Sequence, residues 1–241
     1  MSSLVAWMDR KFYAKYSNNW DDVLFRRWIE RRLRPKDHVL DLGAGAGIVS
    51  QMNFRGCAAR VCGVDLDPRV TENSFLDEGR QASGEAIPYP DGAFDLVFSD
   101  NVLEHLSDPI AIFREVHRVL KPGGIFLAKT PNRSHYVPFL ARLTPLQVHR
   151  FLNRLRGRAA VDTFPTCYQA NSPRQIRELA HAAGLKVRQI ELVEGRPEYL
   201  RLSAGTYAFG LLYERLVNAL PPLARFRVLL LAEMERPRSE G

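Results

Sequence analysis

Short apolar runs alternate with amphipathic segments along the first 130 residues. The apolar runs have the length and composition of buried parallel strands, and the segment "PIAIFREVHRVLKPGG" between the last two repeats apolar residues at helical spacing. We expect Pro122, Gly123 and Gly124 to end that helix. Strands that alternate with helices predict an α/β fold with a doubly wound, mainly parallel sheet. The expected strands are "HVLDLG", "RVCGVDLD" (60–67), "AFDLVFSD" (93–100) and "GGIFLAKT" (123–130).

The same patterns predict further elements on both sides of this core. Residues 20–34 form an amphipathic helix that Pro35 stops, with basic residues opposite the apolar face. A later helix begins after Ser172 as its cap and ends at Gly184, before another strand. The stretch "EYLRLSAGTYAFGLLYERLVNALPPLA" predicts an apolar inserted helix, and "FRVLLLAEMERP" predicts the last strand.

The chain of 241 residues suits one domain, 1–241, with two insertions. We expect an N-terminal helical segment at 1–35 and a core at 36–131. A basic cap insertion follows at 132–171, because Asn132 to Arg158 holds six arginines, two histidines and no acid. The second half of the sheet then occupies 172–241, with a helical insertion at about 198–224.

Composition excludes several classes of protein. No apolar run is long enough to span a bilayer, and the N-terminal "MSSLVAWMDRKFYAKY" has charges where a signal peptide needs an apolar stretch. We therefore expect a cytoplasmic protein. Cys57, Cys62 and Cys167 are odd in number and form no CxxC pair, which argues against a disulfide framework and a zinc site. The net charge of +7 favours anionic partners.

The stretch "VLDLGAGAGIVS" places glycines at every second position directly after a strand. Such a turn lets the backbone approach a ligand, although a tight turn that needs positive φ gives the same pattern. The dinucleotide fingerprint GxGxxG would need a glycine at position 48, where Ile48 stands, so a dehydrogenase is disfavoured. Asp65 ends the next strand and can accept hydrogen bonds from ribose hydroxyls. Asp67, before Pro68, is interpreted as a helix cap or a solvated residue.

Four consecutive stretches resemble the motifs of class I S-adenosylmethionine (SAM)-dependent methyltransferases, and most closely the ubiquinone- and menaquinone-type small-molecule enzymes. They are "VLDLGAGAG", "GVDLDP", "GEAIPYPDGAFDLVFSDNVLEHLSDP" and "REVHRVLKPGGIFLAKTPN". The resemblance covers about residues 36–131. It implies SAM as the cofactor and a Rossmann-like sheet of seven strands in the order 3-2-1-4-5-7-6, with the last strand antiparallel.

The resemblance also implies roles for single residues. Asp41 lies in the pocket of the methionine part, where an acid suits a cationic ligand, and Asp65 holds the ribose. Leu66 sandwiches the adenine ring, and Ser83 stands where the family often has an acid near the adenine amine. The expected cofactor-binding residues are Asp41, Gly43, Ala44, Gly45, Gly47, Asp65, Leu66, Ser83, Gly84, Glu85, Ser99, Asp100 and Asn101.

The stretch "NVLEHL" has three interpretations. Some quinone O-methyltransferases bind a divalent metal here through Glu-x-x-Glu-His, but this chain has Asn101 in place of the first Glu, so we expect no metal. His105 is a candidate general base, or a helix-start residue that bonds to the backbone. In the cap, His135 and Tyr136 are further catalytic candidates. Asn132 and Tyr168 are candidate substrate-binding residues, although Tyr136 and Tyr168 are equally suited to packing the cap on the domain.

We expect an enzyme that methylates a small-molecule, lipid or glycan acceptor at oxygen. The basic cap and the apolar stretch 205–220 favour an anionic or lipid-linked substrate and peripheral contact with the inner membrane face. Positive charge also fits a nucleic-acid methyltransferase, but "SDNV" replaces the "[ND]PP[YF]" motif typical of exocyclic-amine methylation. A SAM-binding protein without activity is a third alternative.

Overall fold

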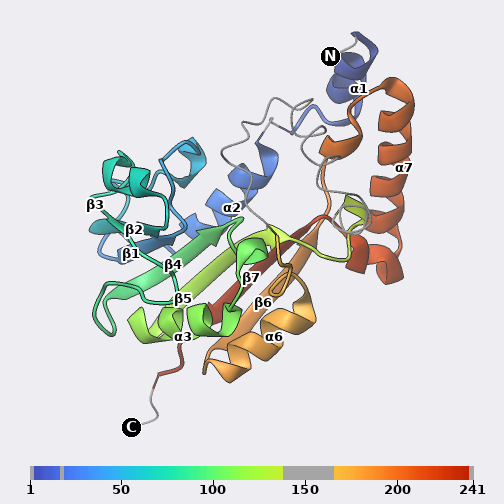
Figure 1. The fold of residues 1–241 in the computed structure, drawn as a ribbon. Helices are drawn as coiled ribbons and strands as arrows, with labels where there is room; N and C mark the ends of the chain where they lie inside the picture. The colour runs from blue at the N-terminus through green and yellow to red at the C-terminus, as the bar shows by residue number, and fades with distance from the viewer. Residues whose placement is uncertain (1–2, 17–18, 138–165, 239–241) are drawn as a thin grey trace.

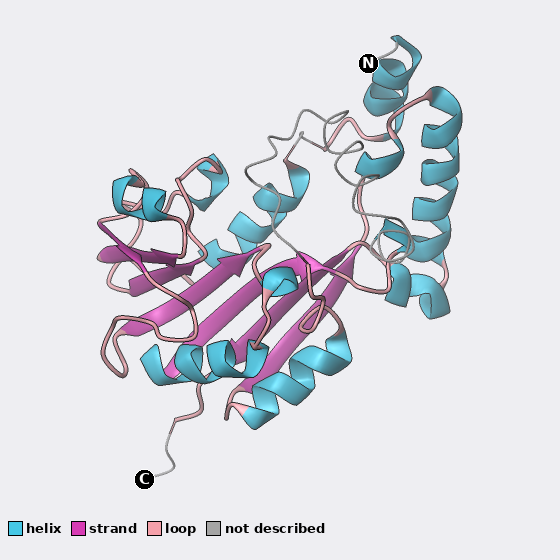
Figure 2. Ribbon diagram, in the orientation of Figure 1, coloured by secondary structure: helices cyan, strands magenta, loops and turns pink. Residues whose placement is uncertain are grey.

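A seven-stranded sheet forms the centre of the computed structural model, which describes residues 3–16, 19–137 and 166–238 (Figures 1 and 2). The strand order β3-β2-β1-β4-β5-β7-β6 is the order expected from the resemblance. β7 pairs antiparallel with both neighbours, and the other pairs are parallel. The strands are β1 (His38–Leu42), β2 (Arg60–Asp65), β3 (Glu78–Gln81), β4 (Phe94–Asp100), β5 (Leu120–Pro131), β6 (Lys186–Val193) and β7 (Leu229–Glu235).

Helices cover both faces of the sheet and continue beyond one end of it (Figure 1). α3 (Pro109–Val119) and α6 (Pro173–Ala182) lie on one face, and α2 (Trp20–Glu30) lies on the other. α1 (Ser3–Phe12) and α7 (Ala204–Ala219) pack together at one end of the molecule. The short 3-10 helices are η1 (Ser50–Met52), η2 (Pro68–Glu72), η3 (Leu103–His105), η5 (Glu198–Leu200) and η6 (Pro221–Phe226).

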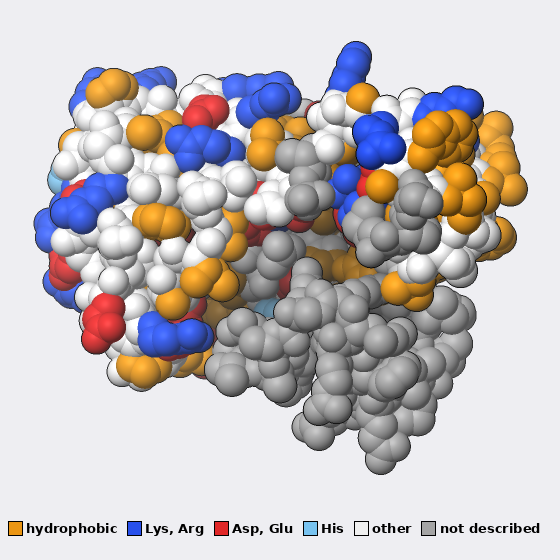
Figure 3. Space-filling view, turned by 90° about the horizontal axis from the view of Figure 1, so that it is seen from above, with side chains coloured by type: hydrophobic (Ala, Val, Ile, Leu, Met, Phe, Trp, Pro, Cys, Tyr) orange, Lys and Arg blue, Asp and Glu red, His pale blue; other side chains and the backbone are white. Residues whose placement is uncertain are grey.

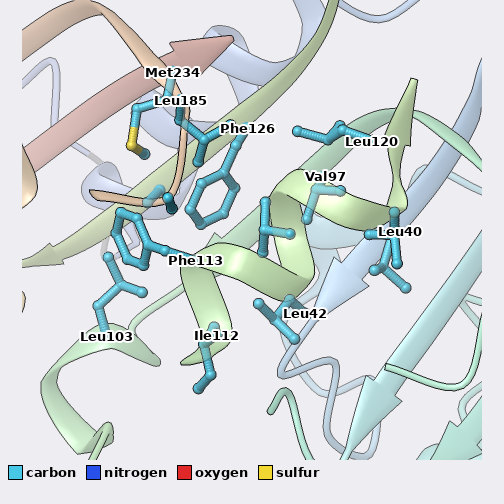
Figure 4. Packing of buried hydrophobic residues seen from close by; sticks show 14 of the residues in the cluster. Leu40, Leu42, Val97, Leu103, Ile112, Phe113, Leu120, Phe126, Leu185 and Met234 are labelled. Atoms are coloured by element: carbon cyan, nitrogen blue, oxygen red, sulfur yellow. The ribbon is translucent and has the colours of Figure 1, made fainter. Parts of the chain in front are cut away.

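The sheet separates two buried apolar layers, because the side chains of a strand alternate between its faces. Phe113 of α3 contacts Phe126 of β5 edge-on, with 5.7 Å between ring centroids (Figure 4). On the other face, Phe25 of α2 and Phe54 pack around Phe98 of β4. Strands buried on both faces explain the near-continuous apolar runs in the sequence.

Local signals place the helix starts where the sequence predicts them. Asp108 accepts a hydrogen bond from the Ala111 N–H at 3.2 Å, and Ser172 caps α6 in the same way through Gln175. Gly184 follows α6 with φ +79°, which is the left-handed conformation of a C-terminal glycine. None of the helices in the described ranges has both the length and the apolar content required to cross a bilayer.

Several expected boundaries are wrong. β3 was not predicted, because the edge strand "EGRQ" has no apolar run. α3 ends at Val119, before Pro122, because β5 already begins at Leu120. The glycine loop leads into the three-residue helix η1. Residues 138–165, most of the expected cap with five of its six arginines, lie outside the described residues.

Candidate functional site

A cavity of about 1090 Å³ lies at the carboxyl edge of the sheet. The parallel strands end there, and the loops that follow them form its walls, as is usual for ligand sites in open α/β sheets. β6 is antiparallel to β7, which is antiparallel to β5, so the carboxyl end of β6 reaches the same edge. The main lining segments are 19–22, 41–49, 64–67, 82–85, 100–102, 104–107, 135–136, 194, 196–199 and 201–202.

The glycine loop after β1 requires its glycines on two grounds. Gly43 has φ +88° and Gly47 has φ +70°, a region that side chains rarely adopt. A Cβ atom on Gly43 would lie 2.2 Å from Cγ2 of Val102, and one on Gly47 would lie 2.2 Å from Oδ1 of Asn73. The loop therefore passes closely under the cavity. Because only a short 3-10 turn follows it, the loop lacks the helix N-terminus of a phosphate-binding site.

Asp65 organises this loop from the end of β2. Its Oδ2 accepts a hydrogen bond from the Gly45 N–H at 2.8 Å, and its Oδ1 accepts one from the Asp67 N–H at 2.8 Å. Each carboxylate oxygen has a second lone pair, so both can still accept from a ligand hydroxyl. Asp67 instead caps η2 and pairs with Arg69, as the sequence suggests. Leu66 lines the cavity with 70% of its surface exposed.

The floor of the cavity favours a positively charged ligand. Burial raises the pKa of Asp41 well above its usual range, and the carboxylates of Asp100 and Asp65 raise it further. A cation that approaches the floor makes Asp41 easier to ionise. Ala44, Ser83, Gly84, Glu85 and Asn101 also line the cavity, together with Gly43, Gly45 and Gly47.

Asp100 belongs to a buried ionic network that the sequence reading missed. Its Oδ1 lies 2.9 Å from Nζ of Lys129, which is fully buried in β5. The same ammonium contacts the carboxylates of Asp21, at 3.1 Å, and Asp22 of α2. Burial raises the pKa of Asp100 to about 6 despite the nearby ammonium. The network fixes α2, and with it Asn19 to Asp22, against the cavity.

Three residues expected in the site do not line the cavity. Ser99 is fully buried, because its side chain projects from β4 on the side opposite to its neighbour Asp100. Asn132 is also fully buried, and its Nδ2 donates to the carbonyl oxygens of Arg225 and Arg227 at 2.8 and 2.7 Å. Tyr168 is held by its backbone N–H, which donates to the Glu104 carbonyl oxygen at 3.1 Å. Asn132 therefore holds a loop in place, and the expected roles of these three residues stay predictions that the cavity lining does not support.

His105 of η3 also lines the cavity. Its Nε2 is 3.9 Å from Oε1 of Glu104, and its side chain is 31% exposed. Glu104 is buried, and its Oε2 accepts from the hydroxyl of Thr130 at 2.9 Å, which accepts from Nδ2 of Asn171 at 2.6 Å. Burial raises the pKa of Glu104. Among the described residues, no group of three His, Cys, Asp or Glu side chains could hold a metal ion.

The far end of the cavity contains His135, Tyr136 and a residue that the sequence reading missed, Glu194. Nδ1 of His135 accepts from the Val137 N–H at 3.3 Å, and its Nε2 lies 3.8 Å from Oε2 of Glu194. The Tyr136 ring lies 4.1 Å from the imidazole, centroid to centroid. Both members of the His135–Glu194 pair are buried.

Burial determines the protonation of this pair. It lowers the pKa of His135 to about 3, so the imidazole is neutral. It raises the pKa of Glu194 to about 8, although the Val228 N–H donates to its Oε2 at 2.9 Å. A carboxyl group that titrates near neutral pH in a cavity is a candidate acid or base. The sequence feature that could have identified Glu194 is its position directly after β6, at the edge of the sheet where the other site residues lie.

Comparison with known proteins identifies a domain in the first half of the chain. The profile of the methyltransferase domain family matches residues 40–128. A probable S-adenosylmethionine-dependent methyltransferase of Mycolicibacterium smegmatis is 35% identical over 52% of this chain and 48% of its own length. A ubiquinone biosynthesis O-methyltransferase of Xanthomonas axonopodis pv. citri is 32% identical over 52% of this chain and 59% of its own. The chain thus spans about half the length of these curated relatives.

The fold is shared with solved structures over most of the chain. The [4+2]-cyclase SpnF superposes with a TM-score of 0.59 over 93% of this chain and 83% of that one, at 20% identity. At this identity the similarity establishes the Rossmann-like fold alone. Because a protein named as a cyclase has this fold, the chemistry must be argued from the side chains of the cavity.

Proposed function

We propose, from the match of residues 40–128 to the methyltransferase domain family, that the chain transfers a methyl group from SAM to an oxygen atom of a small-molecule, lipid or glycan acceptor. One observation carries the proposal. A single cavity joins the glycine loop, with Asp41 and Asp65, to a second end that holds His105, His135 and Glu194. The first end suits a cationic nucleoside, and the second holds groups that can exchange a proton with an acceptor.

The residues of the first end fit SAM. The two Asp65 oxygens keep lone pairs for the ribose hydroxyls, and exposed Leu66 offers an apolar surface to the adenine. The acidic floor at Asp41 favours the positive charge of the amino-acid part and the sulfonium. When bound, SAM supplies an electrophilic methyl group, and the protein has mainly to position the acceptor in line with it.

In this proposal Glu194 takes the proton that the acceptor hydroxyl loses when its oxygen forms the bond to the methyl carbon. Its pKa of about 8 lies close to neutral pH, where a general base works best. His135, with a pKa of about 3, is too weak a base for this step. As a neutral imidazole that accepts at Nδ1, it carries its proton on Nε2 and can orient Glu194 or the acceptor. His105 is the alternative proton acceptor.

The preference for oxygen rests on the ubiquinone biosynthesis O-methyltransferase relative, which shares the cofactor half of the chain. The residues at the second end lie largely outside the matched stretch, so the relative does not define the acceptor. We therefore keep the acceptor class broad, and we include RNA as an outcome of the test because of the net charge of +7.

The first experiment is calorimetry with SAM, and with NAD as the control ligand. We expect saturable binding of SAM and no binding of NAD. The absence of SAM binding would refute the proposal. The second experiment incubates the protein with methyl-tritiated SAM and separate cell fractions of lipids, glycans, small metabolites and RNA. Label in one of the first three fractions supports the proposed acceptor class, whereas label only in RNA would replace it with a nucleic-acid methyltransferase.

The role of Glu194 is tested with Glu194→Gln, which retains the size and the hydrogen-bond acceptor of the side chain. We expect SAM affinity to stay within about twofold while methyl transfer falls by about 10² to 10⁴-fold, as for the loss of a general base. The matched comparison is His105→Gln. If His105→Gln abolishes transfer and Glu194→Gln does not, the proton acceptor is His105.

A further inference from the structure

Helix α7 exposes an apolar stripe along its solvent side. Phe209, Leu212, Leu216 and Leu220, the last at the helix end, follow one another at helical spacing and are 42 to 67% exposed. The opposite side of the helix is buried against the protein through Tyr207, Gly210, Glu214 and Val217. The helix therefore has two apolar sides, of which only one is covered by the described parts of the chain.

Helix α1 extends this surface. It packs beside α7 through Val5, Met8 and Tyr207, and it exposes Leu4 and Trp7 to solvent. We call the combined surface the α1/α7 face. Figure 3 shows hydrophobic side chains gathered at this end of the molecule, with Lys and Arg side chains beside them. The face consists of Leu4, Trp7, Phe209, Leu212, Leu216 and Leu220.

The charges around the α1/α7 face are of one sign. The exposed charged residues of α1, α7 and η6 are all basic: Arg10, Lys11, Arg215 and Arg225. The acids of the same helices are engaged internally. Asp9 accepts from Arg201 and Tyr207, and buried Glu214 accepts from Tyr13 and Asn218. Oε2 of Glu214 also lies 3.4 Å from Nε of Arg215, whose side chain stays 59% exposed. Lys11 lies 4.7 Å from the centroid of the Trp7 ring, so positive charge and apolar surface are adjacent.

We propose that the α1/α7 face docks on the surface of an anionic lipid bilayer. A convex pair of helices with aliphatic and aromatic side chains at its centre and basic residues around them matches an interfacial membrane anchor. Apolar side chains enter the headgroup region, and the basic residues contact anionic headgroups. The charge complementarity favours a bilayer over a second copy of the chain, because two such faces would bring like charges together.

The position of the face relates it to the cavity. Leu202 lines the cavity, is 58% exposed and stands two residues before α7 begins. The chain therefore runs from the cavity rim directly into α7, and in our proposal an acceptor held in the bilayer enters the cavity from the side of Leu202. This extension to the acceptor rests on the proposed methyl transfer, whereas the docking itself does not.

The test is flotation of the purified full chain with vesicles, without SAM or acceptor, so that it is independent of catalysis. We use phosphatidylcholine vesicles with and without about 30% phosphatidylglycerol, which gives the vesicles the negative surface potential of an anionic membrane. The wild type should float with the anionic vesicles and remain in solution with neutral ones. Recovery in the soluble fraction with both compositions would overturn the proposal.

The apolar contribution is tested with the double variant Phe209→Ser/Leu212→Ser. Both side chains are largely exposed, so the variant keeps its packing, which circular dichroism checks. We expect vesicle binding to fall at least about tenfold, because the serine side chains have little apolar surface to transfer from water into the bilayer. The matched control is Ile48→Ser/Leu66→Ser, two exposed apolar residues beside the glycine loop, which should float like the wild type. Equal flotation of both double variants would contradict the assignment of the face.

The electrostatic contribution is tested with Lys11→Gln/Arg215→Gln. Its control, Arg174→Gln/Arg177→Gln, removes the same charge from exposed positions of α6. We expect a loss of about three- to tenfold for the first variant and none for the second. Light scattering tests the competing occupant. A wild-type dimer that Phe209→Ser/Leu212→Ser converts to monomer, without vesicle binding by either protein, would assign the face to self-association and overturn the proposal.

Discussion

The buried carboxyl group of Glu194 gives a prediction that needs no ligand. Replacing it by glutamine leaves the volume and one acceptor oxygen in place, so the Val228 N–H keeps its hydrogen bond. What changes is the ability to ionise. Burial raises the pKa of Glu194 to about 8, and the nearby carboxylate of Glu214 adds to the rise.

The sign of the pH effect follows from proton binding. Between pH 4.5 and about 8 the folded protein holds a proton on Glu194 that the unfolded chain has released. The free energy of unfolding therefore falls as pH rises through this interval. His135 acts in the opposite direction, because its pKa falls from 6.5 to about 3 on folding, so it makes stability rise with pH between these values. Of these two residues, only Glu194 still changes the free energy of unfolding above pH 6.5.

The interval from 4.5 to about 8 corresponds to an upper value of about 5 kcal/mol, at about 1.4 kcal/mol per pH unit. Relaxation and water entry reduce such values, so we expect Glu194→Gln to be about 2 to 5 kcal/mol more stable than the wild type at pH 9. At pH 5 the two proteins should agree within about 1 kcal/mol, because the carboxyl group is then protonated.

The measurement is urea unfolding, followed by circular dichroism, at pH 5, 7 and 9. Glu178→Gln on the exposed surface of α6 is the matched control, and its difference from the wild type should not change with pH in this way. The reasoning is refuted if the free energy of unfolding of Glu194→Gln and of the wild type changes equally with pH, or if the variant is the less stable protein at pH 9. Either result would mean that burial does not disfavour the ionised form of Glu194.

Three further predictions concern other parts of the site. Asp65→Ala should weaken SAM binding at least about 100-fold in calorimetry, because bonds to the loop and the ribose are lost, whereas Asp67→Ala should stay within about threefold. Lys129→Met should lower the free energy of unfolding by about 3 to 5 kcal/mol at pH 8, and by less at pH 5, where Asp100 is protonated; an equal loss at both pH values would contradict the network. Asn132→Ala should cost about 1 to 3 kcal/mol in urea unfolding. At low temperature it should leave SAM affinity unchanged, and a large loss of affinity would restore Asn132 to the site.

The sequence contained most of the central sheet. Strands buried on both faces leave continuous apolar runs, and β1, β2, β4 and β5 were found in this way. β3 is an edge strand that pairs with a neighbour on one side only, so "EGRQ" needs no apolar pattern and escaped notice. The bounds of α1 inside the expected helical segment 1–35 were not predicted, because this helix depends on packing against α7, a partner about two hundred residues away.

Site residues that stand at the end of a single strand could be predicted from the sequence. Residues whose role depends on contacts between distant segments could not. Asp41 and Asp65 stand at strand ends after recognisable motifs, and both reach the cavity. Asn132 follows β5 in the same manner, yet its amide is engaged by carbonyl groups about 95 residues later, which no local pattern reveals. Lys129 read as one polar residue in an apolar strand, because its three carboxylate partners come from two other elements.

The long-range contact of Lys129 has a consequence for how the chain is made. Asp21 precedes Lys129 by 108 residues. During synthesis on a ribosome, α2 therefore emerges well before β5, the strand whose lysine neutralises the acids of α2. At about 5 to 20 residues per second, the delay is roughly 5 to 20 seconds. During that time the apolar side of α2, with Phe25, Trp28 and Ile29, lacks the part of its cover that β5 provides through Leu127. We therefore expect α2 to be open to chaperones during synthesis until β5 is complete.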